Sequence, residues 1–102
     1  MRPILPADLD LAARVLLNLP KVERRAVIAR LIGQADIADR YRKRLGRAHP
    51  LYGSGSLMAA ALRHRHDAPA RHCDDDYCAC LAEVLDALAV YRARIPQART
   101  GR

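Results

Sequence analysis

Residues 21–45, KVERRAVIARLIGQADIADRYRKRL, decide the fold class of this chain. Aliphatic residues recur along the stretch at intervals of three and four, which places them on one face of an α-helix. Pro20 suits the start of such a helix, and Gly46 suits its C-terminal cap. We therefore expect one long helix here, with a bend or a close helix contact at Gly33. The middle of its apolar face is formed by Ile28, Leu31, Ala35 and Ala38.

The segments on either side of this helix also carry helical periodicity. We expect a helix over residues 7–18, a short one over 57–64 and a third long one over 74–94. No alternating pattern predicts a strand. The sequence therefore predicts an all-α fold, a compact bundle of three long helices and one short helix within residues 1–96. A basic tail, 97–102, is expected to be disordered.

The composition fits a single small domain in a reducing compartment. Of 102 residues, 51% are hydrophobic but only 4% are aromatic, so we expect an aliphatic core. No apolar run reaches the ~20 residues of a membrane span, and we expect no membrane contact. The odd, closely spaced set Cys73, Cys78 and Cys80 does not suit a disulfide framework and favours a cytoplasmic location.

The net charge favours a polyanionic partner. Eighteen Lys and Arg residues against eleven Asp and Glu residues give a formal charge of +7, which suits nucleic acid first. Because Lys21 and Lys43 are the only lysines, a GC-rich coding bias is an alternative source of the arginines. Total charge alone therefore does not decide between the two explanations.

The positive charge is concentrated in one segment. Residues 40–71 contain eight Lys and Arg residues and a single acid, Asp67. Either they form a surface that contacts DNA phosphates, or they are a solvated helix end favoured by the helix dipole. Backbone amides behind Ser54 and Ser56 are a candidate anion cradle, and Tyr41 and His49 could assist. The candidate nucleic-acid contacts are Arg40, Arg42, Lys43, Arg44, Arg47, Arg63 and Arg65.

Catalytic and nucleotide-binding motifs are not recognisable. The stretch GSGSLM, residues 53–58, lacks the Lys-Ser/Thr pair of a phosphate-binding loop. The acidic run 74–76 is explained by helix capping and the helix dipole. We expect neither an enzyme nor a small-molecule substrate.

A zinc site is the alternative interpretation of the His/Cys-rich segment. Its candidate ligands are His64, His66, His72 and Cys73. The spacing does not resemble that of a structural zinc site, and Cys78 and Cys80 lie on nearly opposite sides of a helix. We interpret Cys80 or Cys78 as a small buried hydrophobic residue and expect no cofactor.

Three segments resemble a group of short alphaproteobacterial proteins typical of the Rhodobacter relatives. They are MRPILPADLDLAARVLL (1–17), ADRYRKRLGRAHPLYGSGSLMAAAL (38–62) and DDDYCACLAEVLDAL (74–88). The resemblance implies an association with gene transfer agents, phage-like particles of these bacteria. Small basic helical proteins act there in DNA packaging, as small terminase subunits, or in activating the gene cluster.

Two functional hypotheses follow. The first is a non-enzymatic DNA-associated protein that binds phosphates with low base selectivity. The alternative is an adaptor that binds a protein partner or forms a homo-oligomer. In that case the small residues of the long helix suggest self-association through Ile28, Leu31, Ala35 and Ala38.

Overall fold

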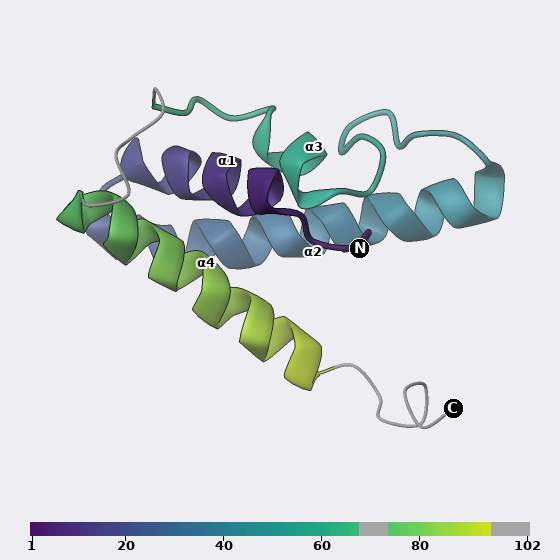
Figure 1. Cartoon of the computed structure of the whole chain (residues 1–102). Helices are drawn as coiled ribbons and strands as arrows, with labels where there is room; N and C mark the ends of the chain where they lie inside the picture. Colours follow the sequence, from purple (N-terminus) through teal and green to yellow (C-terminus); the bar gives the residue numbers. More distant parts are fainter. Residues whose placement is uncertain (68–73, 95–102) are drawn as a thin grey trace.

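The computed structural model describes residues 1–67 and 74–94, and its ordered elements are helices (Figure 1). They are α1 (Pro6–Leu17), α2 (Lys21–Leu45), α3 (Leu57–Ala61) and α4 (Asp75–Ala93). Within these two ranges there is no strand, only an isolated bridge between His49 and Gly53. The prediction of an all-α fold with three long helices and one short one is therefore confirmed. The predicted tail, 97–102, lies outside the described residues.

Local capping signals set the ends of the helices. Gly46 ends α2 in the left-handed conformation, with φ of 74°, and its N–H donates to the carbonyl of Arg42. Ser56 caps α3 by accepting a hydrogen bond from the Ala59 N–H, and the Asp74 carboxylate caps α4 in the same way. The short helix ends at Ala61, earlier than predicted, and the chain continues in tighter turns in which the Arg63 N–H donates to the Ala60 carbonyl and the His64 N–H to the Ala61 carbonyl.

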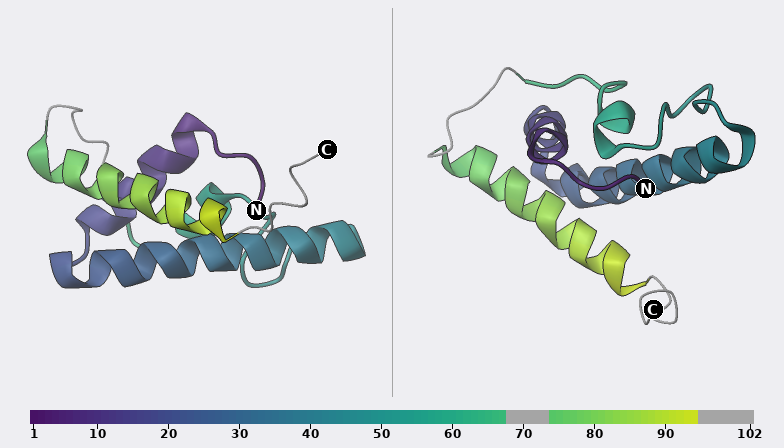
Figure 2. Two further views of the ribbon diagram at one scale, coloured as in Figure 1. Left: turned by 90° about the horizontal axis from the view of Figure 1, so that it is seen from below. Right: turned by 45° about the vertical axis from the view of Figure 1, so that its right-hand side comes forward.

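α2 is the longest helix, and the other three pack along it (Figure 1). α1 and α3 lie on one side of α2, and α4 contacts both α1 and α2. α4 runs at an angle to α2 (Figure 2), and it contacts α2 at both of its ends: Asp76 in its first turn binds Arg24, and Tyr91 near its last turn donates to Asp36 at 2.9 Å. The C-terminal end of α2 extends beyond the other helices, and residues 46–56 lead back from it to α3.

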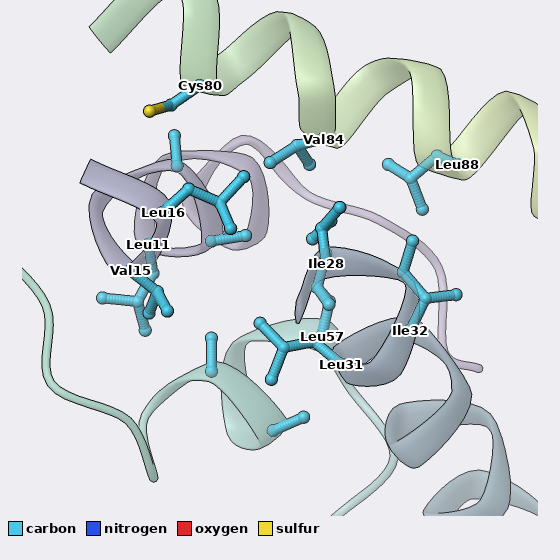
Figure 3. Packing of buried hydrophobic residues seen from close by; sticks show 14 of the residues in the cluster. Leu11, Val15, Leu16, Ile28, Leu31, Ile32, Leu57, Cys80, Val84 and Leu88 are labelled. Atoms are coloured by element: carbon cyan, nitrogen blue, oxygen red, sulfur yellow. The ribbon is translucent and has the colours of Figure 1, made fainter. Parts of the chain in front are cut away.

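The core lies where the helices meet. Leu11 and Leu16 of α1, Ile28 and Leu31 of α2 and Val84 of α4 converge there (Figure 3). Cys80, completely buried, points into the same cluster. Its interpretation as a small buried hydrophobic residue is confirmed.

The proposed self-association face of α2 is part of this core. Ile28, Leu31, Ala35 and Ala38 are all completely buried within one chain. Because α2 contacts α1, α3 and α4, its apolar face is already covered. The prediction that these four residues bind a second copy is therefore wrong.

Two further observations concern the faces of α2 and α4. A Cβ added at Gly33 would have no atom within 4 Å, so no helix packs closely against this glycine. Leu85 of α4 is a large aliphatic residue but is 49% exposed. The angular position that faces the core instead belongs to Cys80, Val84 and Leu88.

A buried arginine ties three elements together. The Arg24 Nε donates to the Leu16 and Leu19 carbonyls at 2.9 and 3.2 Å, which closes the break between α1 and α2. Its Nη1 contacts the Asp76 carboxylate at 2.9 Å in the first turn of α4. This hydrogen bond from Arg24 lowers the pKa of Asp76. Arg24 therefore has a structural role that the sequence did not indicate.

Candidate functional site

The C-terminal end of α2 gathers most of the predicted phosphate contacts. Residues 40–47, together with Asp36 and Asp39, form what we call the basic end of α2. Helical spacing sets its contacts, since residues three or four apart lie on the same face. Arg40 pairs with Asp36 at 3.1 Å, and Arg42 and Lys43 pair with Asp39 at 3.2 and 3.1 Å.

The two carboxylates are shared by more cations than they can neutralise. The α-amino group of Met1 lies 2.8 Å from Asp36 Oδ1 and 3.2 Å from Asp39 Oδ2. Four cations therefore surround two carboxylates. Burial of Asp39 acts to raise its pKa, but the hydrogen bonds from Lys43, the amino group and Arg42 outweigh this effect and lower it. Both carboxylates are thus held ionised, and the basic end retains a positive surplus.

Two arginines at this end have side chains open to solvent. Arg44 and Arg47 are exposed, and neither forms an ion pair within the part of the chain that the structure describes. Arg42 differs from them because its Nε donates to the Ser54 carbonyl at 3.1 Å, which holds the returning loop against α2. Arg42 is therefore as much a structural residue as a candidate contact.

Arg63 and Arg65 are not part of the basic end. Both are exposed, but the segment that carries them runs from α3 away from the C-terminal end of α2 (Figures 1 and 2). Asp67 then contacts α1, where its N–H donates to the Arg14 carbonyl and its own carbonyl accepts from Arg14 Nε at 2.8 Å. The prediction that all seven basic residues share one surface is wrong for these two arginines.

The candidate anion cradle at the start of α3 is filled by the chain itself. The buried Asp8 carboxylate accepts a hydrogen bond from the Met58 N–H at 2.8 Å and one from the Leu5 N–H at 2.7 Å. The Ala59 N–H is bound by Ser56 Oγ. At the start of α3 the Met58 amide thus binds an internal carboxylate and the Ala59 amide an internal hydroxyl, so the predicted role in binding an external anion is wrong.

The rings beside the basic end hold the loop together. His49 stacks on Tyr52, with ring centroids 4.7 Å apart, and meets Tyr41 edge to face at 4.8 Å. The His49 Nδ1 accepts hydrogen bonds from the Leu51 and Tyr52 N–H groups at 3.0 and 3.1 Å. These contacts fix the turn that follows α2 and so the place where Arg47 lies.

The zinc alternative gains no support from the described residues. In residues 1–67 and 74–94 no group of three or more His, Cys, Asp or Glu side chains could hold a metal ion. His66 Nδ1 lies 3.1 Å from the His64 carbonyl oxygen. His72 and Cys73, the other two predicted ligands, lie outside the described residues.

A groove between α2 and α4 was not predicted. It has a volume of about 710 Å³ and is lined on the α2 side by Ala29, Ile32 and Gly33. Val90 and Tyr91 line it from α4, together with the charged residues Glu83, Asp86 and Arg94 and with Ala89. Gly33 lines this groove, which explains why an added Cβ would have no atom within 4 Å. A sequence pattern does not reveal such an open space.

Together these features define a small all-α domain whose distinctive surface is a basic helix end. In the described part of the chain, no helix is both long and apolar enough to cross a membrane. Residues 2–88 match the domain of unknown function DUF7742. The chain therefore belongs to the DUF7742 family. No curated protein and no solved structure matches it.

Proposed function

We propose that this domain is a non-enzymatic nucleic-acid-binding protein that contacts the phosphates of DNA through the basic end of α2. The observation that carries the proposal is the charge at this end. Four cations share two carboxylates there, while Arg44 and Arg47 point into solvent without an ion pair in the described residues. A surface of this kind attracts phosphates without reading bases.

The existing ion pairs do not prevent phosphate binding. The side chains of Arg40 and Lys43 are 71% and 68% exposed, and exposed ion pairs contribute only ~0–1 kcal/mol. A DNA phosphate can therefore compete with Asp36 or Asp39 for these cations. Arg42 is tied to the loop by Ser54 and contributes charge from a fixed position.

The biological setting that we propose follows from the sequence resemblance. A basic helical protein that holds DNA without base selectivity suits the DNA packaging of gene transfer agents, as a small terminase-like subunit, or the regulation of their gene cluster. The DUF7742 match is compatible with either role and names neither. Copurification with a packaging motor subunit would favour the packaging role.

Fluorescence anisotropy with short DNA duplexes tests the proposal. Affinity should be the same for duplexes of unrelated sequence, and log Kd should change linearly with log salt concentration. Arg44→Glu and Arg47→Glu should each weaken binding and reduce the salt slope by about 0.9. The matched control is Arg30→Glu, since Arg30 is also exposed on α2 and forms no ion pair in the described residues. This control should retain the wild-type slope.

Two results would overturn the proposal. One is a wild-type chain that binds no duplex even at low salt. The other is an equal loss of binding for Arg30→Glu and Arg44→Glu, because total charge and not the basic end of α2 would then be responsible.

A further inference from the structure

The side of α4 that faces away from the core carries several exposed apolar residues beside the exposed Asp86, and no described element covers it. Figures 1 and 2 show α1 and α2 on one side of α4, and Ala89 lies at the border of the groove toward α2. The exposed apolar residues of the outward side are Cys78, Ala79, Ala82, Leu85, Ala89 and Ala93.

We propose that this side of α4 binds the same side of a second copy, with the two α4 helices antiparallel. We call the contact line the α4 seam. Its residues recur at intervals of three and four, the spacing at which two helices pack side by side. They are Asp75, Cys78, Ala82, Leu85, Ala89 and Arg92, all of them exposed in the single chain.

The order of residue sizes along the α4 seam suits an antiparallel pair. In that orientation the second helix runs in the opposite direction along the seam, so a residue near one end of the seam faces a residue near the other end in the second copy. Leu85 of one copy then lies opposite Ala82 of the other, and this pairing occurs twice because the pair is two-fold symmetric. Cys78 likewise faces Ala89. A large side chain thus meets a small one at the centre, so the helices can approach closely.

Charge complementarity identifies the occupant as a second copy. The same antiparallel register sets Asp75 of one chain against Arg92 of the other at both ends of the seam. Both residues are exposed, and neither forms an ion pair in the described part of the chain. A parallel pair would instead place like charges opposite each other, which is unfavourable. The charged ends therefore select both the partner and its direction.

The expected dimer is weak and independent of the DNA contacts. The seam runs along one helix for about 26 Å, so the interface is at the small end of specific interfaces and a micromolar Kd is expected. None of its residues belongs to the basic end of α2. Loss of DNA binding and loss of dimerisation are therefore separable by mutation.

Sedimentation velocity over a range of about 1 to 500 μM tests the dimer. Leu85→Asp should raise the dimer Kd about tenfold or more, because a charge replaces the central apolar contact. The matched control is Ile37→Asp on α2, since Ile37 is 45% exposed and lies off the seam. This variant should dimerise like the wild type, and circular dichroism checks that both variants remain helical.

Charge exchange tests the orientation. Asp75→Arg alone and Arg92→Asp alone should each weaken the dimer, whereas the double variant should restore it, since opposite charges again meet across an antiparallel seam. A double variant as weak as the singles would overturn the antiparallel register. A wild-type chain that stays monomeric throughout the concentration range, or a dimer unaffected by Leu85→Asp, would overturn the α4 seam itself.

Discussion

At the scale of single residues, Gly55 fixes how the loop packs on α2. Its φ is +103°, and an added Cβ would lie 2.7 Å from the Cα and 2.8 Å from the Cβ of Asp39. We expect Gly55→Ala to lower the free energy of unfolding by at least about 2 kcal/mol, since it combines backbone strain with overpacking. Urea denaturation at pH 7 measures this change. An unchanged midpoint would mean that the loop does not pack against Asp39 as described.

Tyr77 makes the stability of the protein sensitive to alkaline pH. Burial, together with the 2.8 Å hydrogen bond from its hydroxyl to Asp10, raises the pKa of Tyr77 from 10.0 to about 12. A raised pKa means that the folded state holds the proton more tightly than the unfolded state. Its contribution is therefore complete below pH 10 and is lost between about pH 10 and 12.

Tyr77→Phe should remove this contribution. At pH 7 the variant should be about 1 kcal/mol less stable, because it lacks the hydrogen bond to Asp10. The difference from wild type should shrink as the pH rises from 10 to 12. Urea denaturation at pH 7 and pH 11 measures both values. A constant difference would contradict the assignment of the raised pKa to Tyr77.

At the scale of elements, α2 tolerates a larger residue at Gly33, in contrast to Gly55. A Cβ there meets no atom within 4 Å, and the residue lies inside a continuous helix. Gly33→Ala should therefore raise the free energy of unfolding by about 0.5–1 kcal/mol, because alanine favours helix more than glycine does. A thermal unfolding midpoint above that of the wild type would show this stabilisation. Destabilisation would show that the groove beside Gly33 is filled in solution.

The helix boundaries were predictable because their causes are local. The bounds of α2 depend on Pro20 and Gly46, and the start of α4 depends on the capping carboxylate of Asp74. The inward side of α4 was less predictable. Apolar residues occupy more than one face of this helix, so periodicity alone does not distinguish Leu85, which is exposed, from Cys80, which is buried.

The candidate site was predictable only in part, because chain direction is not a local property. Arg44 and Arg47 follow from their place at the end of α2, where a helix end and its cap keep them together. Arg63 and Arg65 were expected beside them, but the chain leaves α3 in the other direction. The buried position of Asp8 at the start of α3 likewise depends on how α1 and α3 pack together, and the spacing of residues in the sequence does not predict this packing.

At the scale of the whole molecule, Asp36 and Asp39 connect parts that are far apart in the chain. Asp36 accepts a hydrogen bond from the Tyr91 hydroxyl of α4 at 2.9 Å and contacts the amino group of Met1. Burial acts to raise the pKa of Asp36, but the hydrogen bonds from that amino group and from Tyr91 lower it on balance. The same carboxylates that hold the molecule together also limit the positive charge of the basic end.

Because the pKa values of Asp36 and Asp39 are lowered in the folded state, the free energy of unfolding should decrease at acidic pH. A carboxyl group with a lowered pKa in the folded state stabilises the protein above its ordinary pKa of 3.8. That contribution is lost as the pH falls from this value through the lower pKa of the folded state. We expect Asp39→Asn to be about 2 kcal/mol less stable at pH 7, because the charged partners Arg42 and Lys43 lose a buried carboxylate.

The pH dependence distinguishes a lost charge pair from a simple packing defect. The difference in the free energy of unfolding between wild type and Asp39→Asn should narrow as the pH falls below about 4, since wild-type Asp39 then also becomes neutral. A gap that stays constant down to pH 2, measured by urea denaturation, would mean that the ion pairs contribute no stability. In the same variant the basic end of α2 keeps its cations and loses an anion, so DNA binding should strengthen. Stability and phosphate affinity at this end of the molecule should therefore change in opposite directions.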